Sequence, residues 1–115
     1  MFKIVVLVSG NGSNLQALIN NCIENHIAGN IVGVICNDPN AFAIKRAENH
    51  SIPCEIIDHK EFLSREEFDQ RVLDSLIKMQ PDLIVLAGFM RILTNIIIDR
   101  FENKFFSENV DLNGE

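Results

Sequence analysis

The residues best suited to chemistry form a short run from Ser9 to Asn14, with the sequence Ser-Gly-Asn-Gly-Ser-Asn. Gly10 and Gly12 permit backbone conformations that are closed to other residues and let an anion approach the main chain. A helix beginning at Ser13 or Asn14 would point free N–H groups into the loop, and its dipole would attract an anion by roughly 0.3–1 kcal/mol. The run therefore predicts a phosphate-binding loop.

Two common phosphate loops do not match this run. The dinucleotide motif Gly-x-Gly-x-x-Gly needs a third glycine where Leu15 stands, and a P-loop needs a lysine, whereas no lysine occurs between Lys3 and Lys45. Asp38 could hold a ribose as in dinucleotide enzymes, but its place before Pro39 is more typical of a helix cap. A tight strand-to-helix turn that binds no ligand stays open as the alternative for the loop.

A second candidate group runs from Gly88 to Leu93, with the sequence Gly-Phe-Met-Arg-Ile-Leu. Gly88 would allow close approach of a ligand, and Arg91 is a cation flanked by apolar residues, which suits a planar, partly apolar ligand with acidic groups. Arg65 begins an expected helix, an unfavourable place for a cation, which weakly indicates a ligand role. Ordinary surface positions for both arginines remain the alternative.

The histidines and cysteines of the sequence give little support for metal binding or nucleophilic catalysis. Three histidines share no metal-ligand spacing and are expected on the surface: His26, His50 and His59. Three cysteines form no Cys-x-x-Cys pair and are expected to be reduced and part of the core: Cys22, Cys36 and Cys54. The spacing therefore predicts no metal site and no nucleophilic triad.

Length and charge narrow the class of protein. The 115 residues fit one domain, and a net charge of −6 argues against general nucleic-acid binding. The apolar run Ile4–Val8 is too short to span a membrane and lacks the cleavage site of a signal peptide. We expect a reduced, cytoplasmic protein with small-molecule partners.

Strand-like and helix-like patterns alternate along the first half of the chain. Ile4–Val8 is typical of a strand buried on both faces, and Ile31–Cys36 predicts a second strand. The helix between them would turn one apolar face inward: Leu15, Leu18, Ile19, Cys22 and Ile23. A second helix, capped by Asp38 with Pro39 at its first position, would turn three residues inward: Ala43, Ile44 and Ala47.

The alternation continues in the second half. Pro53–Ile57 predicts a third strand and Leu83–Ala87 a fourth. Ser64 and Glu67 form a capping box, with Leu63 and Phe68 spaced for a hydrophobic staple. The helix that follows would bury one face before Pro81 ends it: Phe68, Val72, Leu76 and Met79. Thr94 would cap a short helix that runs through Phe101.

This order predicts an α/β, doubly wound, mostly parallel sheet with right-handed crossovers. The usual arrangement places the first strand in the middle, flanked by the second and the fourth. Ligands then bind beyond the carboxyl ends of the strands. Those ends carry three segments: Ser9–Asn14, Asn37–Asp38 and Gly88–Arg91.

Two segments, Val6–Ala17 and Asp82–Leu93, strongly resemble the phosphoribosylglycinamide formyltransferases of purine biosynthesis, and the resemblance extends from about Lys3 to about Lys104. It implies a Rossmann-like formyltransferase fold, truncated after the N-terminal βα units. It also implies transfer of a formyl group from 10-formyltetrahydrofolate, as co-substrate, to the amine of glycinamide ribonucleotide, with no metal and no tightly bound cofactor.

The resemblance also assigns binding residues. The ribose phosphate would contact three residues of the first loop: Gly12, Ser13 and Asn14. The folate would contact five further residues: Arg65, Met90, Arg91, Ile92 and Leu93.

The chain departs from the family near its end. There the family has a fifth strand and the sequence Asn-x-His-Pro, whose Asn and His act in catalysis with a later Asp. This chain has Ser107 where that Asn is expected and Asn109 where that His is expected. We therefore expect a binding half over residues 1–104, a divergent tail over residues 105–115, no catalytic residue and no activity of this chain alone.

Two other functions remain open at this point. The chain could be a non-catalytic phosphate- or nucleotide-binding module completed by a partner chain. A dinucleotide-dependent oxidoreductase is less favoured because the third glycine is missing. The fourth-strand side and the edge at Phe105–Phe106 would be uncovered, so self-association is also expected.

Overall fold

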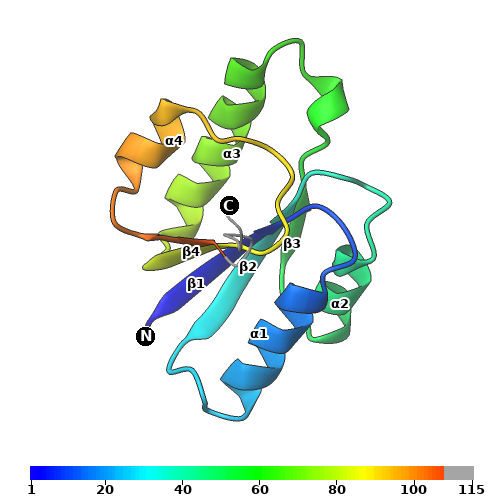
Figure 1. Ribbon diagram of the computed structural model, residues 1–115, viewed down its shortest axis with the longest axis vertical. Coiled ribbons are helices and arrows are strands. Elements are labelled where there is room, and N and C mark those ends of the chain that lie inside the picture. The colour runs from blue at the N-terminus through cyan, green and yellow to red at the C-terminus, as the bar shows by residue number, and fades with distance from the viewer. Residues whose placement is uncertain (108–115) are drawn as a thin grey trace.

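A single parallel sheet forms the centre of the computed structural model, which describes residues 1–107 (Figure 1). Its strand order is β3-β2-β1-β4-β5. The strands are β1 (Lys3–Val8), β2 (Asn30–Cys36), β3 (Cys54–Ile56), β4 (Leu83–Leu86) and β5 (Phe105–Ser107). The predicted doubly wound fold is confirmed, with the first strand between the second and the fourth.

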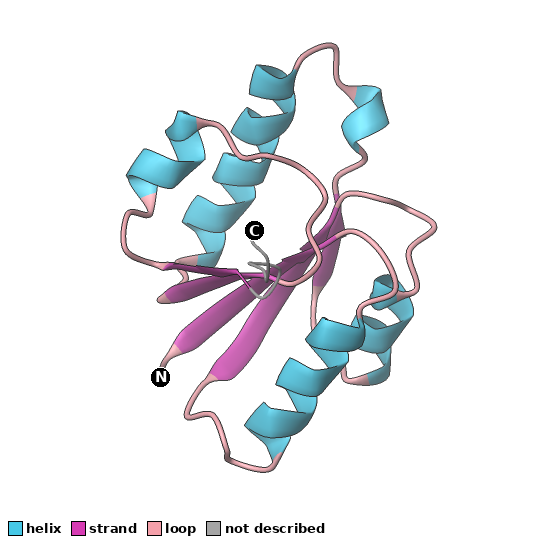
Figure 2. Ribbon diagram, viewed as in Figure 1, coloured by secondary structure: helices cyan, strands magenta, loops and turns pink. Residues whose placement is uncertain are grey.

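Helices cover both faces of the sheet (Figure 2). They are α1 (Ser13–Ile23), α2 (Ala43–Asn49), α3 (Arg65–Met79) and α4 (Asn95–Arg100), with a 3-10 turn η1 (His59–Glu61) before α3. Helices α1 and α2 lie on one face, and α3 and α4 lie on the other. The structure shows the expected layers of an α/β fold.

Strand β1 explains the unbroken apolar run near the N-terminus. Ile4, Val6 and Val8 pack in the core beneath α1 and α2. Val5 and Leu7 pack in the core beneath α3 and α4. Because successive side chains of a strand point to opposite faces, a central strand of a covered sheet is apolar at every position.

The start of α2 differs from the prediction. Asp38 does not cap this helix, because its Oδ1 accepts a hydrogen bond from the Asn40 amide at 2.9 Å within a preceding turn. The helix begins at Ala43, whose amide donates to the Gly10 carbonyl at 3.2 Å. A contact with a distant loop, rather than the local cap, therefore sets the first turn of α2.

The start of α3 is a modified capping box. The Ser64 hydroxyl accepts from the Glu67 amide at 3.1 Å, as predicted, but the Glu67 carboxylate accepts from the Leu63 amide at 3.2 Å. The predicted staple is wrong, because the Leu63 side chain is 95% exposed. Phe62 lies against Phe68 instead, with ring centroids 5.8 Å apart.

The end of α1 and the start of α4 also differ from the prediction. Ile23, expected to point inward, is exposed because it lies in the last turn of α1. Thr94 precedes α4 as expected, yet its hydroxyl does not cap the helix; its amide donates instead to the buried Asp69 carboxylate at 2.5 Å. Helix α3 thus fixes the start of α4 through a side chain.

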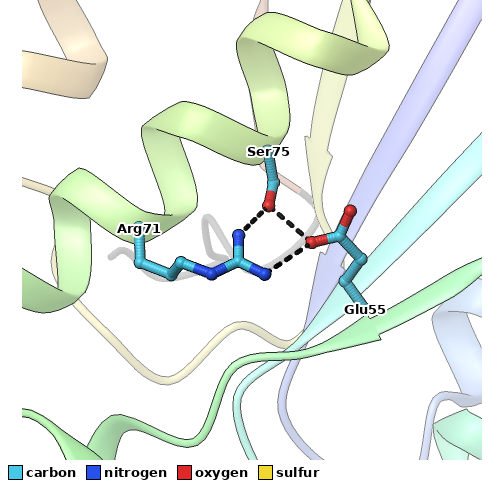
Figure 3. Close-up of polar contacts among 3 residues, drawn as sticks. All are labelled: Glu55, Arg71 and Ser75. Carbon is cyan, nitrogen blue, oxygen red and sulfur yellow. Dashed lines mark hydrogen bonds and ion pairs between the residues drawn. The ribbon is translucent and has the colours of Figure 1, made fainter.

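A polar cluster fastens the edge strand β3 to α3 (Figure 3). Glu55 accepts from the buried Ser75 hydroxyl at 2.5 Å and from Arg71 at 3.2 Å, and Arg71 also donates to Ser75. Each of the three side chains in this cluster has a partner within it, which lowers the cost of burying the Ser75 hydroxyl.

At the other edge, β5 pairs in parallel with β4, so Ile84 lies opposite Phe105. Phe105 packs on the core beneath α3 and α4, whereas Phe106 is largely exposed. The rest of the tail, residues 108–115 with Asn109, lies outside the described residues. Within the described part of the chain, the helices are too short and polar to cross a membrane.

Candidate functional site

The loops after β1 and β4 lie side by side, as expected for neighbouring parallel strands (Figure 1). The Ser9 amide donates to the Gly88 carbonyl at 3.2 Å, and the buried Ser9 hydroxyl accepts from the Met90 amide at 2.8 Å. The two sequence motifs therefore meet at one edge of the sheet, where ligands of such folds bind.

Gly12 turns the first loop into α1. It has φ of +83° and ψ of 23°, and its carbonyl accepts the helical hydrogen bond from the Gln16 amide at 2.8 Å. The amides of Ser13 and Asn14, in the first turn, have no acceptor within the helix. A side chain at Gly12 would place its Cβ 2.7 Å from the Ala43 Cβ. Both backbone conformation and space therefore require glycine here.

The three predicted phosphate residues line one small cavity of about 190 Å³, which we call the Gly12 cavity. Its lining residues come from both loops: Val8, Gly10, Asn11, Gly12, Ser13, Asn14, Ala87, Gly88 and Met90. None of these residues carries a titratable side chain. Main-chain N–H groups, a helix N-terminus and small polar side chains make this a suitable cradle for a phosphate group.

A second cavity of about 390 Å³, which we call the Arg91 cavity, adjoins the first. Its lining residues are Ser9, Gly10, Asn37, Asp38, His59, Met90 and Arg91. Gly10 and Met90 line both cavities. The Arg91 guanidinium lies 5.3 Å from the centroid of the Phe68 ring, which holds this cation at the cavity wall.

Sequence reasoning missed His59 as part of this site. It was expected on the surface, but it is half-buried on η1, and its Nδ1 lies 3.1 Å from the Asn37 main-chain carbonyl oxygen and 3.3 Å from the Asn37 side-chain nitrogen Nδ2. Asn37 itself is buried, and its Oδ1 has no partner among the described residues. The place of Asn37 at the carboxyl end of β2 was the signal that pointed to this edge.

Only some of the residues predicted to bind folate lie together in the Arg91 cavity. Met90 and Arg91 line the Arg91 cavity, whereas Ile92 is exposed and Leu93 packs on the core beneath α3 and α4. Arg65 is exposed at the first position of α3, lines neither cavity, and makes no ion pair within residues 1–107. Arg91 lies against Phe68, three positions after Arg65 on α3, so both arginines belong to the region at the start of this helix.

The cysteines are unpaired thiols, as predicted, and Cys36 is fully buried. Burial raises the pKa of the Cys22 and Cys36 thiols. The pKa of Cys54 rises to about 11, first through burial and then through the nearby Cys36 and acidic side chains. In residues 1–107, no cluster of three or more His, Cys, Asp or Glu side chains could hold a metal ion.

Comparison with known proteins adds independent information. A family model described as formyl transferase matches residues 2–107. The phosphoribosylglycinamide formyltransferase of Escherichia coli is 39% identical over 105 residues, covering 91% of this chain and 50% of that protein. A trifunctional purine biosynthetic protein of Gallus gallus is 41% identical over 105 residues, covering 91% of this chain and 10% of that protein.

Solved structures of phosphoribosylglycinamide formyltransferases are also similar to this chain. Phosphoribosylglycinamide formyltransferase from Coxiella burnetii superposes with a TM-score of 0.86 at 42% identity, over 92% of this chain and 50% of that one. Glycinamide ribonucleotide transformylase 1 from Symbiobacterium toebii gives a TM-score of 0.89 at 33% identity, over 93% and 50%. The chain spans about half the length of these single-function relatives.

Proposed function

The chain belongs to the formyl transferase family over residues 2–107, and on this basis we propose that it is the phosphate-binding half of a phosphoribosylglycinamide formyltransferase. Such an enzyme moves a formyl group from 10-formyltetrahydrofolate to the amine of glycinamide ribonucleotide in purine biosynthesis. The observation that carries the proposal is the Gly12 cavity, in which Gly12, Ser13 and Asn14 would hold the ribose phosphate. Residues 1–104 would form this binding half.

The folate would lie beside the phosphate, because the Arg91 cavity adjoins the Gly12 cavity. Arg91 offers a cation, and the exposed side chains of Met90 and Ile92 offer apolar surface to a planar ring. Leu93 would support this loop from the core, and Arg65 would reach the acidic end of the folate from the start of α3. We propose that the folate binds as a co-substrate and is released after each transfer.

Formyl transfer needs a titratable group within reach of the attacking amine. None lines the Gly12 cavity, and His59 and Asp38 lie in the other cavity. Ser107 stands where the family resemblance places a catalytic Asn. We therefore propose that the 115-residue chain binds both substrates without converting them. Its purified form should give no formyl transfer, and turnover of glycinamide ribonucleotide would contradict this.

A chimeric protein can distinguish this proposal from the alternative, a non-catalytic binding module. The absence of a titratable side chain from the lining of the Gly12 cavity favours that alternative as well. Residues 1–104 would be joined to the part of the Escherichia coli relative that this chain does not match. Formyl transfer by the chimera is the expected result for a formyltransferase half. A folded chimera that binds both substrates but transfers no formyl group would favour the binding module.

The cysteines, the net charge and the edge strand bear on the cellular compartment and the partners of the protein. The unpaired thiols suit a reducing compartment, and we propose the cytoplasm. The acidic net charge of −6 suits small-molecule partners rather than nucleic acid. The largely exposed Phe106 on the edge strand β5 supports self-association, which a concentration-dependent sedimentation coefficient would reveal.

A further inference from the structure

Arg46 on α2 reaches the loop after β1 and binds both oxygen atoms of Asn11. Its Nε donates to the Asn11 carbonyl at 2.8 Å, and its Nη2 donates to the Asn11 Oδ1 at 2.7 Å. The guanidinium also approaches Gln16, with Nη1 3.4 Å from Oε1, and lies 4.9 Å from the centroid of the Phe42 ring. The planar fork of an arginine is thus engaged on several sides.

These contacts act on the lining of the Gly12 cavity. Asn11 lines that cavity, whereas Arg46 does not. A phosphate is attracted by N–H groups and repelled by carbonyl oxygens, so the orientation of Asn11 decides which groups the loop offers. Arg46 engages both Asn11 oxygens as acceptors and adds a positive charge behind the loop.

Helix α2 braces the same loop at two further points. The Ala43 amide donates to the Gly10 carbonyl at 3.2 Å, and Ala43 lies so close to Gly12 that no side chain fits there. Arg46 lies one turn after Ala43 on the same helix. A short helix that makes no contact with the cavity itself therefore fixes the shape of its wall.

We propose that Arg46 is a positioning residue for phosphate binding, which holds Asn11 so that the loop presents its N–H groups to the anion. The inference rests on the proposed function, since it assumes that the Gly12 cavity takes the phosphate. It assigns a role to a side chain that lies 35 positions from its partner in the sequence.

The test compares Arg46→Lys and Arg46→Met with the wild-type 115-residue chain. Calorimetric titration measures the dissociation constants of glycinamide ribonucleotide and of folic acid. Arg46→Met should weaken binding of the ribonucleotide roughly ten- to hundredfold, the effect typical of losing charge-assisted hydrogen bonds. Arg46→Lys keeps the positive charge and the aliphatic chain but loses the planar guanidinium, and it should still weaken binding of the ribonucleotide roughly tenfold. Affinity for folic acid should stay within about twofold, since Arg46 does not line the Arg91 cavity.

Arg71→Met is the control, because it removes a guanidinium that also donates to a side-chain oxygen, in the Glu55 cluster on the other face of the sheet. It should leave the affinity for the ribonucleotide unchanged. If Arg46→Met does not fold, Arg46→Lys carries the test alone.

Several results would overturn the inference. Unchanged ribonucleotide affinity in both Arg46 variants would do so, and so would an equal loss for both ligands, which indicates a merely structural role. Wild-type affinity in Arg46→Lys with a loss only in Arg46→Met would show that charge matters and geometry does not. If the wild-type chain binds no glycinamide ribonucleotide, the proposed function itself fails, and the role of Arg46 falls with it.

Discussion

The Ser9 hydroxyl accepts a hydrogen bond from the Met90 amide at 2.8 Å, across 81 positions of the sequence. This bond joins the loop after β1, which carries the candidate phosphate site, to the loop after β4, which carries the candidate folate site. Together with the bond from the Ser9 amide to the Gly88 carbonyl, this side chain at the end of the central strand joins the two loops that line the cavities.

Ser9→Ala should weaken the contact between these loops, since it removes the side-chain bond and leaves the backbone bond from the Ser9 amide to Gly88. The change leaves the Met90 amide without its acceptor beside a buried position, which we expect to lower the free energy of unfolding by about 1–2 kcal/mol. Urea unfolding measures this loss. Lys78→Ala, at an exposed position of α3 that lines neither cavity, is the control and should change stability by less than about 0.5 kcal/mol. Equal stability of the two variants would contradict the role of Ser9.

Gly12→Ala should be strongly unfavourable, whereas Gly10→Ala should be tolerated. Gly12 has φ of +83°, and an added Cβ would lie 2.7 Å from the Ala43 Cβ, so we expect a loss of about 1–3 kcal/mol. Gly10 has no atom within 4 Å of an added Cβ. Urea unfolding of both variants checks the difference, and similar losses at the two glycines would show that the Ala43 contact is unimportant.

Asp69 should hold the loop that carries Arg91. Its buried carboxylate accepts from the Thr94 amide at 2.5 Å, so Asp69→Ala should cost about 1–3 kcal/mol in the free energy of unfolding. Asp69→Asn keeps an acceptor oxygen and should cost less. Thermal or urea unfolding of both variants measures this order; a larger loss for Asn than for Ala would argue against the hydrogen bond as the cause.

Cys54 should make stability depend on pH above neutrality. Its pKa is about 11 in the folded chain, above the ordinary value of 9.0 that the unfolded chain retains. The folded state therefore favours the neutral thiol, and this contribution is complete below pH 9.0 and is lost as the pH rises toward 11. Between these two pH values, the free energy of unfolding measured with urea should fall more steeply with pH for the wild type than for Cys54→Ala. Parallel curves would contradict the shifted pKa.

The sequence predicted those parts of the fold that depend on local pattern. The unbroken apolar run at Ile4–Val8 indicated a central strand, and the phases of Leu15, Leu18 and Ile19 indicated the buried face of α1, both of which are confirmed. Gly12 also belongs here, because a glycine between a strand and a helix is a local signal.

The parts that sequence reasoning missed depend on distant contacts. Asp38 was expected to cap α2, but the helix starts where Ala43 meets Gly10, and no local pattern encodes that contact. Arg46 contacts Asn11, and His59 contacts Asn37, only because α2 and η1 fold back on the strand ends. Such side chains have no distinctive spacing, so they become recognisable only once the strand order is known.

We propose above that the loop from Gly10 to Asn14 binds the phosphate of glycinamide ribonucleotide. Amide chemical shifts of the ¹⁵N-labelled chain, followed during titration with this ligand, test phosphate binding residue by residue, with the phosphate-free riboside as control. We predict that the largest shifts fall on the amides of Gly12, Ser13 and Asn14, and that the riboside binds at least roughly tenfold more weakly. Equal binding of both ligands, or shifts centred on Asn37 and His59, would show that the phosphate does not bind in this loop.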